Sequence, residues 1–262
     1  SGSDATEKLY YHDSHSREFS ATVLSCEEKI NAKGTKEGYR VVLDRTLFFP
    51  EGGGQFGDQG WIDGIKVTDT HEKNGMIYHE TEAPIAVGAE VKGELDYKER
   101  FSRMQQHTGE HMLSGIIHGL YGYDNVGFHL GAAETTMDFN GELTSEQVRE
   151  VEKLANQAVW DNIPVEILYP TKEELATMDF RSKIEIEGQV RIVRIGDVDM
   201  CACSAPHVSR TGEVGMIKVI SCDRHRGGCR MTSQCGDRAL EDYRKKQDGV
   251  TAVSVALSAP PE

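Results

Sequence analysis

Residues 98–121 read KERFSRMQQHTGEHMLSGIIHGLY and mark the point at which the character of the chain changes. The apolar residues of this stretch recur three or four positions apart, which is the spacing of an amphipathic helix. They are Phe101, Met104, Met112, Leu113, Ile116, Ile117 and Leu120. No comparable pattern precedes them, so the start of this helix separates two regions of different fold.

The region before the helix consists of short apolar runs separated by turn residues such as Asp63-Gly64 and Asn74-Gly75. Short runs with such turns are typical of antiparallel strands joined as hairpins. We predict a small antiparallel β-barrel over residues 4–98. Its expected strands are Ala21–Ser25, Tyr39–Leu43, Trp61–Val67, Met76–His79 and Glu90–Leu95.

The region after the first helix mixes helices and strands. Thr144 with Gln147, and Thr171 with Glu174, fit the start of two further helices. Strands are expected at Val165–Tyr169, Gln189–Ile195 and Glu213–Ile220. This mixture predicts an α+β domain over residues 99–240. Residues 241–262 are expected to form a helical tail that leads into a further C-terminal region.

Composition limits the classes of function. The chain has 262 residues and a net charge of −14, so it is unlike a protein that coats nucleic acid over its whole surface. No apolar run approaches the roughly 20 residues that cross a bilayer, and no export signal is visible, so we expect a cytoplasmic protein without membrane contact. Five of the six cysteines fall between Cys201 and Cys235. In a reducing compartment this grouping indicates metal or thiol chemistry rather than disulfides.

Two pairs of residues predict a metal site. His107 and His111 stand one turn apart on one helical face, so both imidazoles can reach one ion. Cys203 and His207 add a thiolate and an imidazole, and a four-ligand N/S set suits Zn²⁺. Cys201 is a possible competitor of Cys203. His118 is on the same face but roughly 10 Å farther along the helix, too far to share the ion.

Alternative interpretations of these residues stay open at this stage. Residues 107–111 also read H-x-x-E-H, the inverted zincin motif of some metallopeptidases, with Glu110 as the base. Such a peptidase takes its third ligand from a downstream acid, which disfavours this interpretation. Cys222, His225 and Cys229 could form a second metal site.

A glycine-rich stretch lies in the first region, with Gly52, Gly53 and Gly54 followed by Gln55. Without Cβ atoms, the backbone amides of such a stretch can closely approach a phosphate, a ribose or an amino-acid group. A plain turn between strands is the alternative.

Taken together and in this order, the glycine-rich motif, the H-x-x-x-H helix and the C-x-x-x-H motif resemble those of the freestanding alanyl-tRNA editing proteins (AlaX type). They are similar also to those of the editing domain of alanyl-tRNA synthetase. The resemblance covers about residues 8–243. It implies a β-barrel packed on a two-layer α/β editing domain. It also implies a Zn²⁺-dependent deacylase that removes serine, or in some members glycine, from mischarged tRNA(Ala).

The resemblance also suggests roles for single residues. Thr46 matches the family position thought to recognise the serine hydroxyl, and Gly52–Gln55 would line the substrate pocket. The family usually has two glycines and a threonine between the cysteine and the histidine, where this chain has Ser204-Ala205-Pro206. This difference affects the expected shape of the pocket rather than metal binding, and no catalytic base is assigned.

The charge distribution points to a tRNA contact. Residues 203–246 carry nine Lys or Arg and five acidic residues, a net of +4, which leaves −18 for the rest. We therefore expect tRNA to contact this stretch, with Arg226 and Arg230 as the test residues. Three hypotheses follow: a zinc-dependent deacylase acting in trans, a non-catalytic zinc-stabilised tRNA-binding module, and a metallopeptidase.

Overall fold

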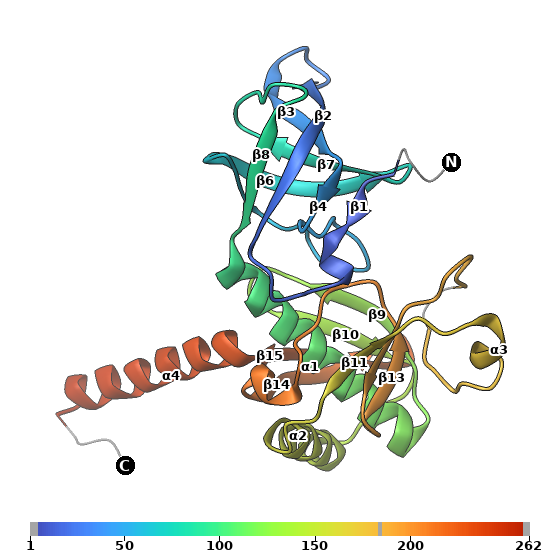
Figure 1. The fold of residues 1–262 in the computed structure, drawn as a ribbon. Coiled ribbons are helices and arrows are strands. Elements are labelled where there is room, and N and C mark those ends of the chain that lie inside the picture. Colours follow the sequence, from blue (N-terminus) through green and yellow to red (C-terminus); the bar gives the residue numbers. More distant parts are fainter. Residues whose placement is uncertain (1–4, 183–184, 259–262) are drawn as a thin grey trace.

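The computed structural model describes residues 5–182 and 185–258. Strands of the N-terminal part lie at one end of the molecule, and helices packed with two sheets lie at the other (Figure 1). This arrangement confirms the prediction of an α+β fold. Residue 4 and residues 259–262, which the predicted domain limits include, lie outside the described residues.

The N-terminal strands form a continuous antiparallel arrangement. Each pairs with two neighbours in the order β2-β3-β7-β6-β5-β8, and β8 pairs back with β2, so the hydrogen bonds close into a barrel. Its interior holds the apolar side chains that alternate along these strands. The members are β2 (Glu18–Ile30), β3 (Lys36–Leu43), β5 (Gly60–Ile62), β6 (Ile65–Lys73), β7 (Met76–Thr81) and β8 (Glu90–Leu95). A short parallel pair, β1 (Glu7–Lys8) with β4 (Arg45–Thr46), flanks them.

One predicted strand in this region is wrong. Residues 61–67 are a hairpin rather than a single strand, because Asp63 and Gly64 adopt φ of 47° and 78° and turn the chain from β5 into β6. Left-handed φ values of this kind belong to tight hairpin turns. The Asp-Gly signal therefore outweighs the apolar run around it.

Helix α1 (Tyr97–Tyr121) follows β8 after one residue. Asp96 caps its start by accepting from the Glu99 amide, and Gly122 ends it in the left-handed conformation at φ 71°. The observed helix begins one residue before the predicted one. Its face packs into the larger core through Met104, Met112, Leu113 and Ile117, all fully buried.

Two sheets surround α1 in the second half of the chain. The first has the order β14-β15-β10-β9 and the second β11-β12-β13, all antiparallel. The sequence did not predict β9, β10, β13 or β15. The bounds are β9 (Asn125–Leu130), β10 (Thr135–Phe139), β11 (Val165–Leu168), β12 (Ile192–Ile195), β13 (Asp199–Ala202), β14 (Ile217–His225) and β15 (Gly228–Cys235).

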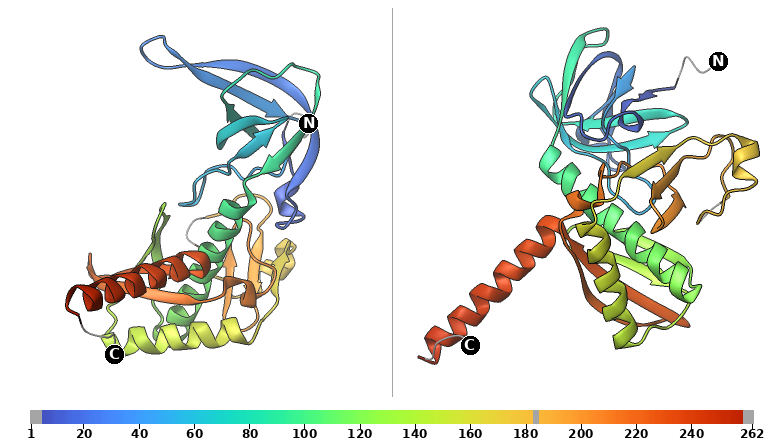
Figure 2. Two further views of the ribbon diagram at one scale, coloured as in Figure 1. Left: turned by 90° about the vertical axis from the view of Figure 1, so that its left-hand side faces the viewer. Right: turned by 60° about the horizontal axis from the view of Figure 1, so that its bottom comes forward.

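The expected strand at Glu213–Ile220 starts late, because Thr211–Val214 form a 3₁₀ turn before β14. Helices α2 (Ser145–Trp160) and α3 (Lys172–Leu175) both begin with the predicted capping boxes. Helix α4 (Gly236–Ala256) runs through the expected boundary at residue 240 and extends away from the sheets (Figure 2). The domain limits themselves stay a prediction.

The two halves are joined by a buried ion pair. Arg100 of α1 donates from Nε and Nη2 to Asp58 Oδ2 at 2.9 and 2.7 Å, and both side chains are almost completely buried. Arg100 also donates to the Leu47 carbonyl at 2.7 Å. Both ends of the glycine-rich segment are therefore held against α1. No helix in the described part of the chain combines the length and apolar character needed to cross a bilayer.

Candidate metal centre and its cavity

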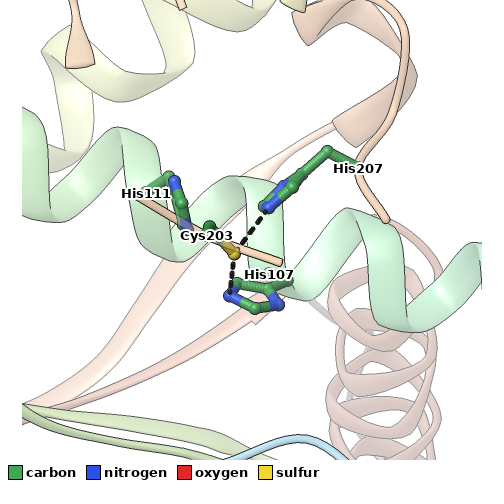
Figure 3. Close-up of side chains that lie close together, drawn as sticks. All are labelled: His107, His111, Cys203 and His207. Atoms are coloured by element: carbon green, nitrogen blue, oxygen red, sulfur yellow. Dashed lines mark hydrogen bonds between the residues drawn. The ribbon is translucent and has the colours of Figure 1, made fainter. Parts of the chain in front are cut away.

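Four side chains converge beside α1: His107, His111, Cys203 and His207 (Figure 3). One potential ligand atom from each lies within 4.8 Å of the others. The two histidines come from one face of α1, and the Cys-x-x-x-His loop follows β13 and folds back onto that face. The structure therefore brings together all four residues that the sequence suggests as ligands.

The spacing in this four-residue cluster fits a tetrahedral ion. Cys203 Sγ lies 3.7 Å from His107 Nε2 and 3.4 Å from His207 Nε2. A tetrahedral Zn²⁺ with ordinary bond lengths separates a sulfur and a nitrogen ligand by about 3.6 Å. The donor set, three imidazoles and one thiol, is also one that zinc prefers.

The second nitrogen of each imidazole faces an oxygen atom. His107 Nδ1 is 2.8 Å from Gln55 Oε1, and His207 Nδ1 is 2.9 Å from Thr108 Oγ1. His111 Nδ1 is 3.4 Å from an oxygen of Asp199, which Arg181 holds by two hydrogen bonds. Such outer partners orient the imidazoles that bind metals. The sequence did not suggest either partner, because Thr108 occupies an unspecified position of the H-x-x-x-H motif and Asp199 belongs to no motif.

Electrostatics prepare the thiol for ligation. Burial of Cys203 opposes its ionisation, but the neighbouring imidazoles of His107 and His207 hold its pKa well below the ordinary value. Burial lowers the pKa of His207 to about 3, which keeps this ring neutral at pH 7. For these two residues, a thiolate and a neutral imidazole are the protonation states that a metal requires.

Cys201 is the less suitable of the two cysteines. Burial raises the pKa of its thiol, whereas that of Cys203 is lowered. Cys201 does form a second cluster with His111 and Asp199, but Asp199 is already engaged by Arg181. The geometry therefore favours Cys203, as the spacing to His207 suggested.

The other metal-capable residues lie apart from the cluster. His118 faces the Tyr123 carbonyl and Asp124. Cys222, His225 and Cys229 do not form a metal-capable group within residues 5–182 and 185–258.

The cluster lies in the wall of a cavity of about 470 Å³. Gly52 and Gly53 line the same cavity from the opposite half of the chain. Gly54 has φ of 85°, and a Cβ there would lie 2.4 Å from the Phe128 carbonyl oxygen, so the loop requires glycine at this position. The Gly54 carbonyl accepts from the Leu130 amide at 2.8 Å, which fixes the loop against β9.

Gln55 does not line the cavity. Its side chain instead contacts the cluster through a hydrogen bond with His107. We expect Gln55→Ala to weaken zinc binding by about 10- to 100-fold, the usual cost of losing an outer partner. Competition with a chromogenic chelator measures this affinity. Gln59→Ala is the matched control, since the Gln59 side chain is bonded to the Thr68 carbonyl. Equal affinities in both variants would contradict the role of Gln55.

Thr46 does not lie in the substrate cavity, the position that the resemblance implies for it. It is fully buried, with its hydroxyl 2.8 Å from His79 Nε2 and accepting from the Phe48 amide. His79 Nδ1 donates to the Val41 carbonyl, so its Nε2 is left to accept from the Thr46 hydroxyl. Burial lowers the pKa of His79 to about 4, so the ring is neutral. This geometry supports a structural role rather than recognition of a substrate hydroxyl.

Thr46→Val is therefore expected to lower stability. It leaves the Phe48 amide and His79 Nε2 without their partner, a loss of about 1–3 kcal/mol in the free energy of unfolding. Urea unfolding measures the loss, and zinc affinity should stay unchanged. Unchanged stability would show that this hydrogen bond contributes nothing.

Glu110 lines the cavity and is 1% exposed. Its Oε1 accepts from Ser114 Oγ and from Asn125 Nδ2, and Oε2 lies 3.7 Å from His111 Nε2. These contacts place the carboxylate beside the cluster and tie α1 to β9.

In the folded chain, arginines of the basic 203–246 stretch pair with acidic residues from outside that stretch. Arg230 forms two hydrogen bonds with Asp138, and Arg224 pairs with Glu142. Both acids belong to the part of the chain that the sequence showed as an acidic body. Arg226 is exposed on the turn after β14 and has no ion pair with any residue that the structure describes. Neither Arg226 nor Arg230 lines the cavity.

Two family models match the chain, one in each half. The model described as tRNA synthetases class II (A) matches residues 2–99, and threonyl and alanyl tRNA synthetase second additional domain matches residues 190–249. The alanyl-tRNA editing protein AlaX-L of Pyrococcus horikoshii is 38% identical over 89% of this chain. Over most of its length the chain is therefore similar to the alanyl-tRNA editing proteins.

Other relatives match the chain to a similar extent. The alanyl-tRNA editing protein Aarsd1 of Mus musculus is 30% identical over 95% of the chain. The alanine–tRNA ligase of Halorubrum lacusprofundi is 32% identical over 98% of it. The chain spans 59% of AlaX-L, 63% of Aarsd1 and 28% of the ligase. His107 and His111 lie between the two family-model matches, so the match to the second model includes only Cys203 and His207.

Proposed function

We propose that the chain hydrolyses the ester that joins serine, or glycine, to mischarged tRNA(Ala), and that it does so in trans. The observation that carries this proposal is the meeting of the four-residue cluster with the Gly52–Gly53 loop in one cavity. A cavity of this size suits an aminoacyl nucleoside. The relatives that are named alanyl-tRNA editing proteins support the same substrate class. We also propose that the chain is divided into a domain over residues 4–98 and a domain over residues 99–240, followed by a tail over residues 241–262.

Zinc is the proposed cofactor, held by His107, His111, Cys203 and His207. Bound Zn²⁺ would order the four side chains and, at any open coordination position, polarise the ester carbonyl. The chain itself would supply the walls: the glycine loop approaches the substrate through its backbone, and Phe49 and Phe128 exclude water. We assign no residue the role of general base.

The test is hydrolysis of Ser-, Gly- and Ala-tRNA(Ala) by the purified protein. Turnover of the serine ester, with Ala-tRNA(Ala) spared, is the expected result. Binding of tRNA without turnover would instead favour the non-catalytic tRNA-binding module. Cleavage of unstructured peptides would favour the metallopeptidase, for which the H-x-x-E-H motif is the only observation.

Arg226 and Arg230 stay proposed tRNA contacts. Because Arg226 is exposed and free of ion pairs in the described residues, we expect Arg226→Gln to weaken tRNA binding and to reduce the slope of log K against log salt by about one. Arg149→Gln, at an exposed position of α2 outside the 203–246 stretch, is the control. Filter binding at several salt concentrations measures both, and an unchanged slope for Arg226→Gln would place the contact elsewhere.

A further inference from the structure

A second cavity, of about 180 Å³, adjoins the first. It lies between residues 10–15, which precede β2, and strand β11. Tyr11 and Arg191 line both cavities and so form the boundary between them. His207 lines the second cavity, which places this space directly beside the four-residue cluster.

Arg191 is an unusual residue for this position. Its side chain is 8% exposed, and its Nη1 donates to the carbonyls of Cys203 and Ala205, both at 2.8 Å. The guanidinium lies 5.1 Å from the centre of the Tyr11 ring, and Nε has no hydrogen-bond partner. Within residues 5–182 and 185–258 no carboxylate forms an ion pair with it. A buried arginine ordinarily pairs with an anion.

We propose that the second cavity binds the phosphate of the 3′-terminal nucleotide of the aminoacyl-tRNA, with Arg191 as its cation. This inference rests on the proposed function. The amino acid is esterified to the terminal ribose, and the phosphate is attached to the 5′ oxygen of the same ribose. A phosphate site must therefore lie one ribose away from the ester. Arg191 meets this condition because it is bonded to the carbonyl of Cys203.

The chemistry of the guanidinium suits a phosphate. Its planar donors match phosphate oxygens, and a charge-assisted hydrogen bond is strongest in a space shielded from water. Asp13 also lines this cavity, but its two oxygens accept from the His15 amide and from Ser16 Oγ. The carboxylate is thus held by its own loop.

Two basic side chains lie farther out from this cavity. His15 lines it and also lines an open cavity of about 540 Å³, whose wall includes Arg17 and Lys98 together with Asp237. Tyr97 and Phe101 form the aromatic part of that outer surface. Cations with aromatic rings are the elements that bind single-stranded nucleic acid. The route for the acceptor end would run from Lys98 past His15 to Arg191.

The first test compares adenosine 5′-monophosphate with adenosine as ligands of the zinc-loaded wild-type protein, by calorimetry. We expect the monophosphate to bind about tenfold more tightly or better, as a charge-assisted bond allows. In Arg191→Gln this preference should disappear. In Arg194→Gln it should persist, because Arg194 lies in β12, just after Arg191 in the chain, but lines neither cavity. Equal binding of both ligands by the wild type would overturn the proposal.

The second test separates phosphate binding from positioning of the Cys203 loop. Arg191→Gln should raise KM for Ser-tRNA(Ala) about tenfold more than it raises KM for 3′-O-seryl-adenosine, which has no phosphate. An equal loss on both substrates, or lost zinc, would reduce Arg191 to a positioning residue and contradict the inference. If the variant does not fold, the wild-type binding comparison decides. Absence of Ser-tRNA(Ala) hydrolysis by the wild type would instead contradict the proposed function.

Discussion

Cys203→Ala is expected to abolish stoichiometric zinc binding and to lower hydrolysis of Ser-tRNA(Ala) by about 100-fold or more. Cys203 is the one thiol in the four-residue cluster, and its lowered thiol pKa favours the thiolate, which is the form that binds a metal. Loss of a ligand should exceed the 10- to 100-fold cost of losing an outer partner. Metal analysis by mass spectrometry and single-turnover deacylation measure the two effects.

Two control variants accompany this prediction. Cys26→Ala makes the same chemical change in β2, far from the cluster, and should keep both zinc and activity. Cys201→Ala tests the competing ligand and should also keep zinc. Retention of zinc by Cys203→Ala together with its loss in Cys201→Ala would show that the cluster uses the other cysteine.

Asp58→Ala is expected to lower the free energy of unfolding by about 3–5 kcal/mol, because it leaves the Arg100 charge buried without its partner. The Phe49 amide, which also donates to Asp58, loses its acceptor as well. The loop between Leu47 and Asp58 would then separate from α1. Urea unfolding measures the loss, and weaker zinc binding should accompany it, because Gln55 lies in that loop.

Asp242→Ala is the control for the stability measurement. Asp242 pairs with Lys246 on the exposed face of α4, and such surface pairs contribute less than about 1 kcal/mol. Equal losses in the two variants would mean that the Arg100–Asp58 pair does not hold the two halves together.

Local signals in the sequence predicted helices well. The start of α1, the capping boxes of α2 and α3, and the strand β8 all depend on residues close together in the chain. The Asp63-Gly64 dipeptide also indicated a hairpin turn, but the apolar residues on both sides of it led to the prediction of a single strand. Strands β9 and β10 were missed because both are short and their place in the sheet depends on a non-local partner: β10 pairs with β15, and β9 pairs with β10.

The cluster could be suggested from the sequence because ligand types and spacing limit what can share an ion. Other parts of the site depend on partners that only folding brings together. Thr46 lies near the glycine loop in sequence, yet its hydroxyl bonds to His79. Arg191 carries no motif, and its importance appears only from its burial between two cavities. Likewise, the sequence could not show that Arg230 of the basic stretch pairs with Asp138, an acid from a distant part of the chain.

The most direct test of the central claim is zinc removal and restoration on the intact protein. Treatment with a strong chelator should remove about one zinc ion per chain and stop hydrolysis of Ser-tRNA(Ala), and one equivalent of Zn²⁺ should restore it. Magnesium should not, since imidazole and thiolate are poor ligands for it. Full hydrolysis by protein shown to be free of metal would contradict the claim that the His107–His111–Cys203–His207 cluster is a zinc centre on which the reaction depends.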